Sequence, residues 1–275
     1  MNYSQIIYEA HEEIRVIRFN RPEVMNCIGP VAHTELVHAW SRFRVDEGAK
    51  VAIITGSGEK AFCAGGDLKD PPVSDEPAEV AAHNRGEKPG YLGPTRWTDI
   101  YKPIIAAING LAYAGGLEWA CFADIRVAEE HATFGVTCRR WNIGLGDGGT
   151  QRLPRIIGMG RALELIITGR VIDAREAEHI GLVNQVVPKG ESLKVAMEMA
   201  RFICSLPQPA MRTDKEAAVR GFGLPLEEGL RIEAQCFNRS IFQPETAEGL
   251  RRFIERDHPD FHKGKANQTP GLVKD

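Results

Sequence analysis

The chain has 275 residues, of which 43% are apolar and 26% are charged, and its formal net charge is −3. This composition predicts a globular protein with a full core, as one large domain or one domain with an appendage. The slightly acidic balance argues against a general nucleic-acid binder. Six cysteines without a C-x-x-C pair disfavour a zinc ribbon or a redox motif. They indicate a reduced protein, and no secretory signal is evident at the N-terminus, so we expect a cytoplasmic location.

Strands and helices are expected to alternate through the first two thirds of the chain. Fully apolar runs are typical of strands that are buried on both faces of a parallel sheet. A helix is expected over 30–46, where Pro30 opens a pattern with approximate helical spacing. Helical patterns between apolar runs predict repeated βαβ units and an α/β fold. The expected strands cover residues 5–10, 13–20, 51–55, 103–108, 124–129 and 182–187.

The remaining segments differ in composition. Residues 70–95 are rich in proline, glycine and charge, which predicts a surface insertion or a mobile loop. We therefore expect residues 1–190 to form the core, and residues 191–275 to form an α-helical C-terminal region that ends in a polar tail. Four helical patterns fall in that region, at residues 191–206, 209–222, 225–240 and 244–257.

Two features of the sequence could be mistaken for a membrane span and a metal site. The 20 residues 104–123 have the length of a membrane span. Three glycines and the carboxylate of Glu118 within that run favour a buried strand, turn and helix instead, so no membrane association is predicted. His258 and His262 are four residues apart, but Pro259 separates them in a polar tail. We therefore expect no metal site.

Two glycine-rich loops are the candidate functional elements. "FCAGGDL" (62–68) and "NGLAYAGGLEWA" (109–120) both follow apolar strands and place paired glycines where a helix begins. N–H groups at such places lack an intrahelical partner, and the helix dipole favours negative charge there. Two of them converging on one point form an oxyanion hole. The alternative is that each glycine pair only allows the chain to turn.

Glu118 lies three residues after Gly115 in the second loop. Because helical side chains lean toward the N-terminus, its carboxylate is expected to lean back over the loop that presents the Gly115 N–H. A carboxylate beside an oxyanion hole suits enolate chemistry, which needs a base and a site for the developing negative charge. The alternative is a charge that is paired with an arginine or with the helix dipole.

The order of these motifs resembles the crotonase superfamily of enoyl-CoA hydratases and isomerases. The resemblance implies a spiral of ββα units with a helical C-terminal trimerisation region. It also implies a lyase or isomerase of the kind found in fatty acid metabolism, with an acyl-CoA or enoyl-CoA substrate, no cofactor beyond the CoA of that substrate, and a homotrimer or a dimer of trimers. The matching segments are 19–28, 62–68, 108–128, 134–158, 167–188 and 248–256.

The resemblance also implies roles for individual residues. Gly66 and Gly115 would offer their N–H groups to the thioester carbonyl, and Glu118 would act as acid and base. The Ala64 carbonyl would meet the adenine, and Phe253 with its helix would reach the CoA of a neighbouring subunit. The implied substrate-binding positions are Val24, Ala64, Asp67, Leu68, Cys138, Phe253 and Arg256.

One position departs from the family pattern. Hydratases carry a second catalytic glutamate, and counting back from "GGTQRL" places it at Cys138. A thiol is mostly neutral at pH 7 and does not replace a carboxylate. Asp147 is either a catalytic replacement or a turn residue. We therefore predict a member that lacks the second glutamate, with decarboxylation, C–C or thioester hydrolysis, or RNA binding without catalysis as the alternatives.

Overall fold

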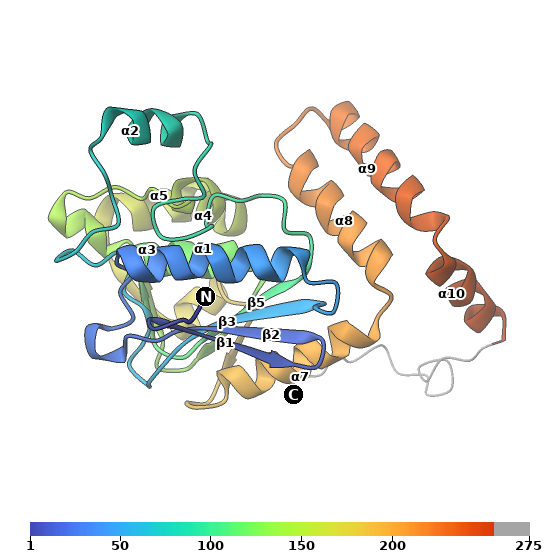
Figure 1. Cartoon of the computed structure of the whole chain (residues 1–275), viewed down its shortest axis with the longest axis horizontal. Helices are drawn as coiled ribbons and strands as arrows, with labels where there is room; N and C mark the ends of the chain where they lie inside the picture. The colour runs from blue at the N-terminus through green and yellow to red at the C-terminus, as the bar shows by residue number, and fades with distance from the viewer. Residues whose placement is uncertain (256–275) are drawn as a thin grey trace.

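A computed structural model describes residues 1–255 of the chain, which form two mixed β-sheets surrounded by helices (Figure 1). In the larger sheet β1 pairs antiparallel with β2, and the other pairs are parallel. Its order is β1 (Ile6–His11), β2 (Ile14–Phe19), β3 (Val51–Gly56), β5 (Ile104–Ile108), β7 (Ile125–Glu129) and β10 (Gln185–Val187). The smaller sheet has the order β4 (Ala61–Cys63), β6 (Leu111–Tyr113), β8 (Thr133–Gly135) and β9 (Val171–Asp173). Only its β8–β9 pair is antiparallel.

All six expected strands of the larger sheet are present, but the last is shorter than predicted. Leu182 and Val183 were expected in a strand, whereas β10 begins at Gln185. The N–H groups of both residues donate to the Ala177 carbonyl oxygen, which closes the end of the preceding helix. Both side chains are buried, so their apolar character reflects core packing in a turn and not a strand.

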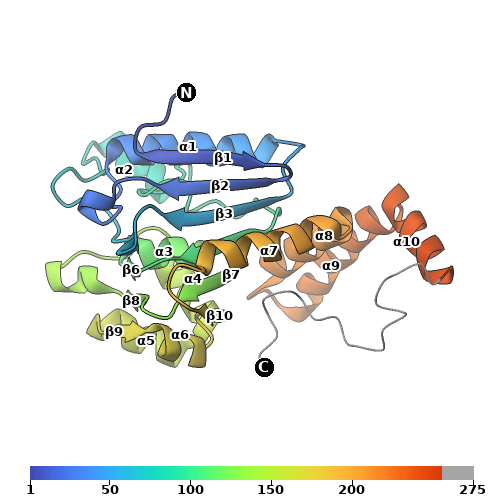
Figure 2. The same cartoon turned by 90° about the horizontal axis from the view of Figure 1, so that it is seen from below.

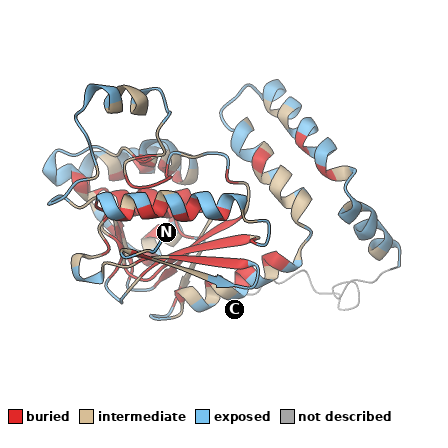
Figure 3. Cartoon of the chain, in the orientation of Figure 1, coloured by how far each residue is buried: buried red, intermediate tan, exposed pale blue. Residues whose placement is uncertain are grey.

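Helices cover both faces of the larger sheet. One face packs against α1 and α3, and the other packs against α7, which runs across it (Figure 2). Figure 3 shows the strands buried between these layers. The helices and 3₁₀ turns of this body are η1 (Pro22–Val24), α1 (Pro30–Val45), α2 (Pro77–Asn84), α3 (Gly115–Phe122), η2 (Thr137–Trp141), α4 (Gly149–Ile157), α5 (Met159–Thr168), α6 (Ala174–His179) and α7 (Ser192–Ser205).

The last helices project away from this body (Figure 1). They are α8 (Gln208–Gly221), α9 (Leu226–Ile241) and α10 (Pro244–Ile254). The four expected C-terminal helices are thus present, while the division at residue 190 stays a prediction. Of the helices in residues 1–255, none is long and apolar enough to cross a membrane.

The prediction of a surface insertion at residues 70–95 was wrong for the end of the segment. Its middle forms α2, which has no buried residue, and Pro77 occupies a first-turn position where its missing N–H has no cost. Residues 92–95, however, are buried, with Leu92 only 7% exposed and Thr95 fully buried. Gly90 and Gly93 have φ values of +146° and +109°, which glycine adopts readily, and they let the chain turn inside the protein.

Candidate active site

The two glycine-rich loops lie at one edge of the smaller sheet. β4 leads into the loop of Gly66 and β6 leads into the loop of Gly115, and the two strands pair in parallel. The ends of parallel neighbours meet at the same edge, so the loops come together. A Cβ atom on Gly65 would lie 2.8 Å from the Gly115 nitrogen, and one on Gly116 would lie 1.8 Å from the Cys63 carbonyl oxygen. The close approach therefore requires glycine.

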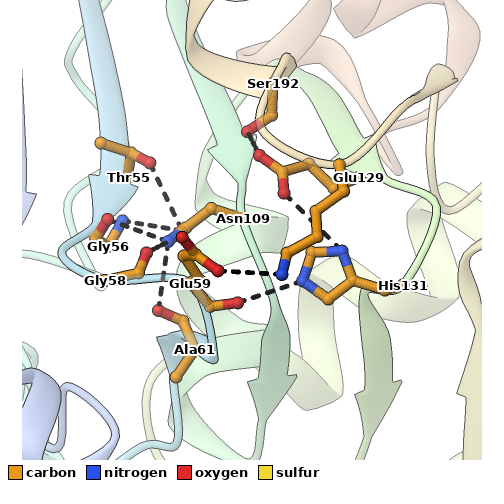
Figure 4. Close-up of polar contacts among 10 residues, drawn as sticks. Thr55, Gly56, Gly58, Glu59, Ala61, Asn109, Glu129, His131 and Ser192 are labelled. Atoms are coloured by element: carbon orange, nitrogen blue, oxygen red, sulfur yellow. Dashed lines mark hydrogen bonds and ion pairs between the residues drawn. The ribbon is translucent and has the colours of Figure 1, made fainter.

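A buried asparagine ties together the segments that lead into both loops (Figure 4). The Asn109 side chain accepts a hydrogen bond from the Gly56 N–H at 3.1 Å. Its amide nitrogen donates to the carbonyl oxygens of Gly56 at 3.0 Å and Gly58 at 2.7 Å. Because both ends of this buried amide are bonded, the turn between β3 and β4 is fixed to the end of β5.

The N–H groups of Gly66 and Gly115 are left without a protein acceptor in the part of the chain that the structure describes. Ile28 donates to the Gly65 carbonyl and accepts from the Asp67 N–H, so the intervening Gly66 N–H faces the other way. Gly115 is the first residue of α3, where an N–H has no intrahelical acceptor. Within residues 1–255 neither N–H donates to a protein acceptor. Both donors are therefore available to a ligand oxygen.

The residue before Gly115 has an uncommon backbone conformation. Ala114 has a φ of 50° and a ψ of −116°, which a residue with a Cβ adopts only under strain. Its N–H donates to the Gly135 carbonyl at 2.9 Å, which holds it in place. The strain lies directly beside the candidate oxyanion donor.

Glu118 is 2% exposed, and it is held by backbone donors. Its Oε1 accepts from the N–H groups of Asp147 and Gly149, both at 2.8 Å. These bonds direct the carboxylate toward the start of α4, and within the described chain it forms no ion pair. Burial, and then the nearby charge of Asp147, raise the pKa of Glu118 to about 7. Such a carboxyl group can both take and give a proton near neutral pH.

Asp147 and Cys138 both interact with Glu118, Asp147 through its N–H and Cys138 through the charge of the carboxylate. The Oδ1 of Asp147 accepts from the N–H groups of Tyr91 and Leu92, both at 2.9 Å. Cys138 is 7% exposed, and burial followed by the charge of Glu118 raises the pKa of its thiol. The thiol is therefore neutral near pH 7. A catalytic role for either residue stays a prediction.

The residues expected along CoA form a second group. The Ala64 N–H donates to the Met25 carbonyl, next to Val24, and the Arg21 guanidinium lies 2.9 Å from Asp67. These contacts bring residues 21–28 beside residues 64–68, and Leu68 is exposed at this face.

Of the two C-terminal residues predicted to bind substrate, Phe253 is not brought to this group. It lies on α10, which projects away from the body of the same chain (Figure 1). Arg256 lies outside the described residues, as do His258 and His262. Among residues 1–255, no cluster of three or more His, Cys, Asp or Glu side chains could hold a metal ion.

The sequence analysis did not identify the residues that support the loops of the candidate site through hydrogen bonds and packing. Arg152 donates to the carbonyl oxygens of Thr95 at 2.6 Å and Trp97 at 3.2 Å. Leu92 contacts the positions where side chains of both candidate oxyanion glycines would begin. Of the supporting residues Asn109, Leu92 and Arg152, Asn109 alone could have been noticed in the sequence, because it is a polar residue inside an apolar run. Leu92 and Arg152 had no such signal, because their contacts are distant in sequence.

The two mixed sheets and the helical C-terminal region constitute the α/β crotonase fold. A family model described as enoyl-CoA hydratase/isomerase matches residues 9–265, and the chain belongs to that family. The predicted fold and enzyme class are thereby confirmed.

Curated relatives and solved structures agree with this assignment. The chain is 36% identical to the (E)-benzylidenesuccinyl-CoA hydratase of Thauera aromatica over 256 residues, which are 93% of this chain and 98% of that protein. It is 36% identical to the crotonyl-CoA hydratase of Syntrophomonas wolfei, with 95% and 99% covered. The crystal structure of enoyl-CoA hydratase from Bacillus anthracis shares 38% identity with a TM-score of 0.83, covering 92% of this chain and 97% of that one. The chain is thus an enzyme of the enoyl-CoA hydratase type.

Proposed function

We propose that this enzyme acts on enoyl-CoA thioesters through an enolate that is stabilised by the N–H groups of Gly66 and Gly115. The observation that carries the proposal is the buried Glu118, with a pKa of about 7, close to two unused backbone donors. The names of the similar hydratases support the substrate class. The residues implied for CoA would hold the nucleotide end of the same molecule.

Each part of the site has a defined chemical task. The thioester oxygen gains negative charge as the enolate forms, and hydrogen-bond donors aimed at that oxygen lower the barrier. The N-terminus of α3 adds a favourable dipole. Glu118 transfers the proton at the carbon chain, for which a pKa near the working pH is most effective. Hydration, isomerisation and decarboxylation all use this enolate, whereas thioester hydrolysis would place the oxygen of a tetrahedral intermediate at the same two donors.

We also propose that the chain assembles as a homotrimer or a dimer of trimers, in which α10 completes the CoA site of a neighbour. Large apolar side chains on α9 and α10 are exposed in the single chain, with Leu226 77% and Phe253 63% exposed, and Phe242 between the two helices is 84% exposed. Exposed apolar surface on projecting helices favours an interaction site. We expect light scattering to give three or six times the mass of the chain. A stable monomer that binds CoA tightly would contradict this assembly.

The position of Cys138 leads to the experiment that tests the proposed reaction. A two-carboxylate site holds water between two groups that can each transfer a proton, whereas here one of them is a neutral thiol. We expect the wild-type enzyme to hydrate crotonyl-CoA slowly and Cys138→Glu to hydrate it faster. Two carboxylates in one site push one pKa upward, which leaves one acid and one base.

The measurement is the loss of the conjugated enoyl absorbance, with identification of the product. Cys138→Gln is the matched control, because it has the size of glutamate without the charge. Brisk hydration by the wild type would show that the missing glutamate does not limit the chemistry, and would favour Asp147 as the second catalytic group. Hydrolysis of crotonyl-CoA to crotonate and free CoA would replace the proposed reaction.

A further inference from the structure

Residues 91–95, "YLGPT", form a buried strap between α2 and the candidate site. Asp147 is its main anchor, because one carboxylate oxygen accepts from Tyr91 N–H, Leu92 N–H and, at 2.5 Å, the Thr95 hydroxyl. Asp147 itself is 3% exposed. Three donors on one buried carboxylate oxygen make this a strong local constraint.

Three further side chains bind the strap from different elements. The Trp119 ring nitrogen of α3 donates to the Leu92 carbonyl at 3.0 Å. The His33 Nδ1 of α1 lies 2.9 Å from the Tyr91 carbonyl oxygen and 3.1 Å from the Gly93 nitrogen. Arg152 of α4 bonds the Thr95 carbonyl. Moving the strap would leave several buried polar groups without partners, so it is a fixed wall and not an opening lid.

The strap places one side chain against both candidate oxyanion glycines. A Cβ atom on Gly115 would lie 2.0 Å from Leu92 Cδ1, and one on Gly66 would lie 3.3 Å from Leu92 Cδ2. The two methyl groups of Leu92 therefore span both glycines. A thioester whose oxygen is bound there has Leu92 as a direct neighbour, and its acyl chain must fit beside this side chain.

We propose that Leu92 limits the size of the acyl group and that Asp147 is a positioning residue that holds Leu92 in place through the 91–95 strap. The inference rests on the proposed function, since it takes Gly66 and Gly115 as the carbonyl site. It gives the Asp147 carboxylate a role that does not require contact with the substrate.

The first experiment measures selectivity in Leu92→Ala. We expect the ratio of kcat/KM for trans-2-decenoyl-CoA to that for crotonyl-CoA to rise by at least about 10-fold, as the removal of a blocking hydrocarbon group allows. Leu36→Ala is the matched control. Leu36 also packs on the strap, since a Cβ on Gly93 would lie 3.1 Å from it, but it belongs to α1 in the core. An unchanged ratio in Leu92→Ala, or an equal rise in Leu36→Ala, would overturn the role of Leu92.

The second experiment separates positioning from catalysis at Asp147. Asp147→Asn keeps an oxygen that can accept from the strap, whereas Asp147→Ala removes it. We expect Asp147→Ala to shift the selectivity ratio in the direction of Leu92→Ala, and Asp147→Asn to keep the wild-type ratio. Thr95→Val, which removes one strap donor, is the milder variant if Asp147→Ala does not fold, and it should shift the ratio in the same direction. A loss of kcat of about 100-fold or more in Asp147→Asn, with the selectivity ratio unchanged in every variant, would instead identify an acid or base.

Binding measurements keep this inference distinct from the proposed reaction. The dissociation constants of butyryl-CoA and decanoyl-CoA, which cannot be hydrated, are measured for the wild type and Leu92→Ala by calorimetry. Improved relative binding of decanoyl-CoA supports Leu92 as the size limit even if no enoyl-CoA is turned over, in which case only the proposed reaction fails. Turnover of enoyl-CoA with unchanged relative binding and selectivity refutes the role of Leu92 alone.

Discussion

Replacement of Glu118 by glutamine is expected to lower kcat by about 10²–10⁴-fold and to leave the affinity for CoA almost unchanged. Glutamine keeps an oxygen that can accept the N–H bonds of Asp147 and Gly149, so the loop before α4 keeps its shape. What is lost is the group that transfers the proton. The measurement is steady-state turnover of the best enoyl-CoA substrate together with calorimetric binding of CoA.

A second buried glutamate provides the control for this experiment. Glu129, at the end of β7, is 4% exposed, and its carboxylate accepts from the Ser192 hydroxyl at 2.7 Å (Figure 4). Glu129→Gln makes the same chemical change outside the candidate site and should keep activity. Near-full turnover in Glu118→Gln would place the base elsewhere, with Asp147 as the next candidate.

The role of Glu118 as the base also predicts how kcat/KM depends on pH. Only the ionised carboxylate accepts a proton, so kcat/KM should rise with pH with a midpoint near 7, and Glu118→Gln should lack this limb. Burial and the charge of Asp147 raise the pKa of Glu118, and the other groups that interact with it are the thiols of Cys121 and Cys138 and the guanidinium of Arg152.

Stability should follow the opposite direction over the same range of pH. Between the ordinary carboxyl pKa of 4.5 and about 7, the folded state keeps a proton that the unfolded chain releases. The contribution of Glu118 to the free energy of unfolding is therefore present at low pH and decreases as pH rises through this range.

Much of this site could be predicted from local sequence, because the signals are local. The apolar runs before each glycine pair predict the strands that end at the loops. The three-residue spacing from Gly115 to Glu118 places the carboxylate in the first turn of α3. These features depend on neighbouring residues, so a single sequence contains them.

The 91–95 strap could not be predicted in this way. Its Gly-Pro pair is typical of an exposed turn, and its burial is decided by partners that are distant in the chain, such as His33 and Asp147. The contacts of Asp147 also depend on residues that are distant in the chain, so its place in the sequence does not reveal them. Its position before "GGTQRL" places it near Glu118, but no sequence pattern shows that its Oδ1 is bonded to the strap.

The second large effect is expected for Gly115→Val, which should raise the activation free energy by about 2.7–4 kcal/mol, the cost of losing one oxyanion donor. The N–H itself remains, but the new side chain would overlap Leu92 and lie 3.2 Å from the Gly65 Cα where its Cβ begins. The thioester oxygen would then be pushed away from both donors. Gly160→Val is the matched control, because Gly160 also lies in the first turn of a helix, α5, and a Cβ there meets nothing within 4 Å.

A smaller substitution separates crowding from a general distortion of the loop. Gly115→Ala brings a Cβ to 2.0 Å from Leu92 Cδ1, and that methyl group is absent in the double variant Gly115→Ala with Leu92→Ala. We expect the double variant to recover part of the kcat/KM for crotonyl-CoA that Gly115→Ala loses, because the space at the donor reopens while the N–H stays in place. Failure to recover would mean that the alanine displaces the N–H itself. Full activity in Gly115→Val would show that the glycines at this edge only turn the chain and that the thioester oxygen binds elsewhere.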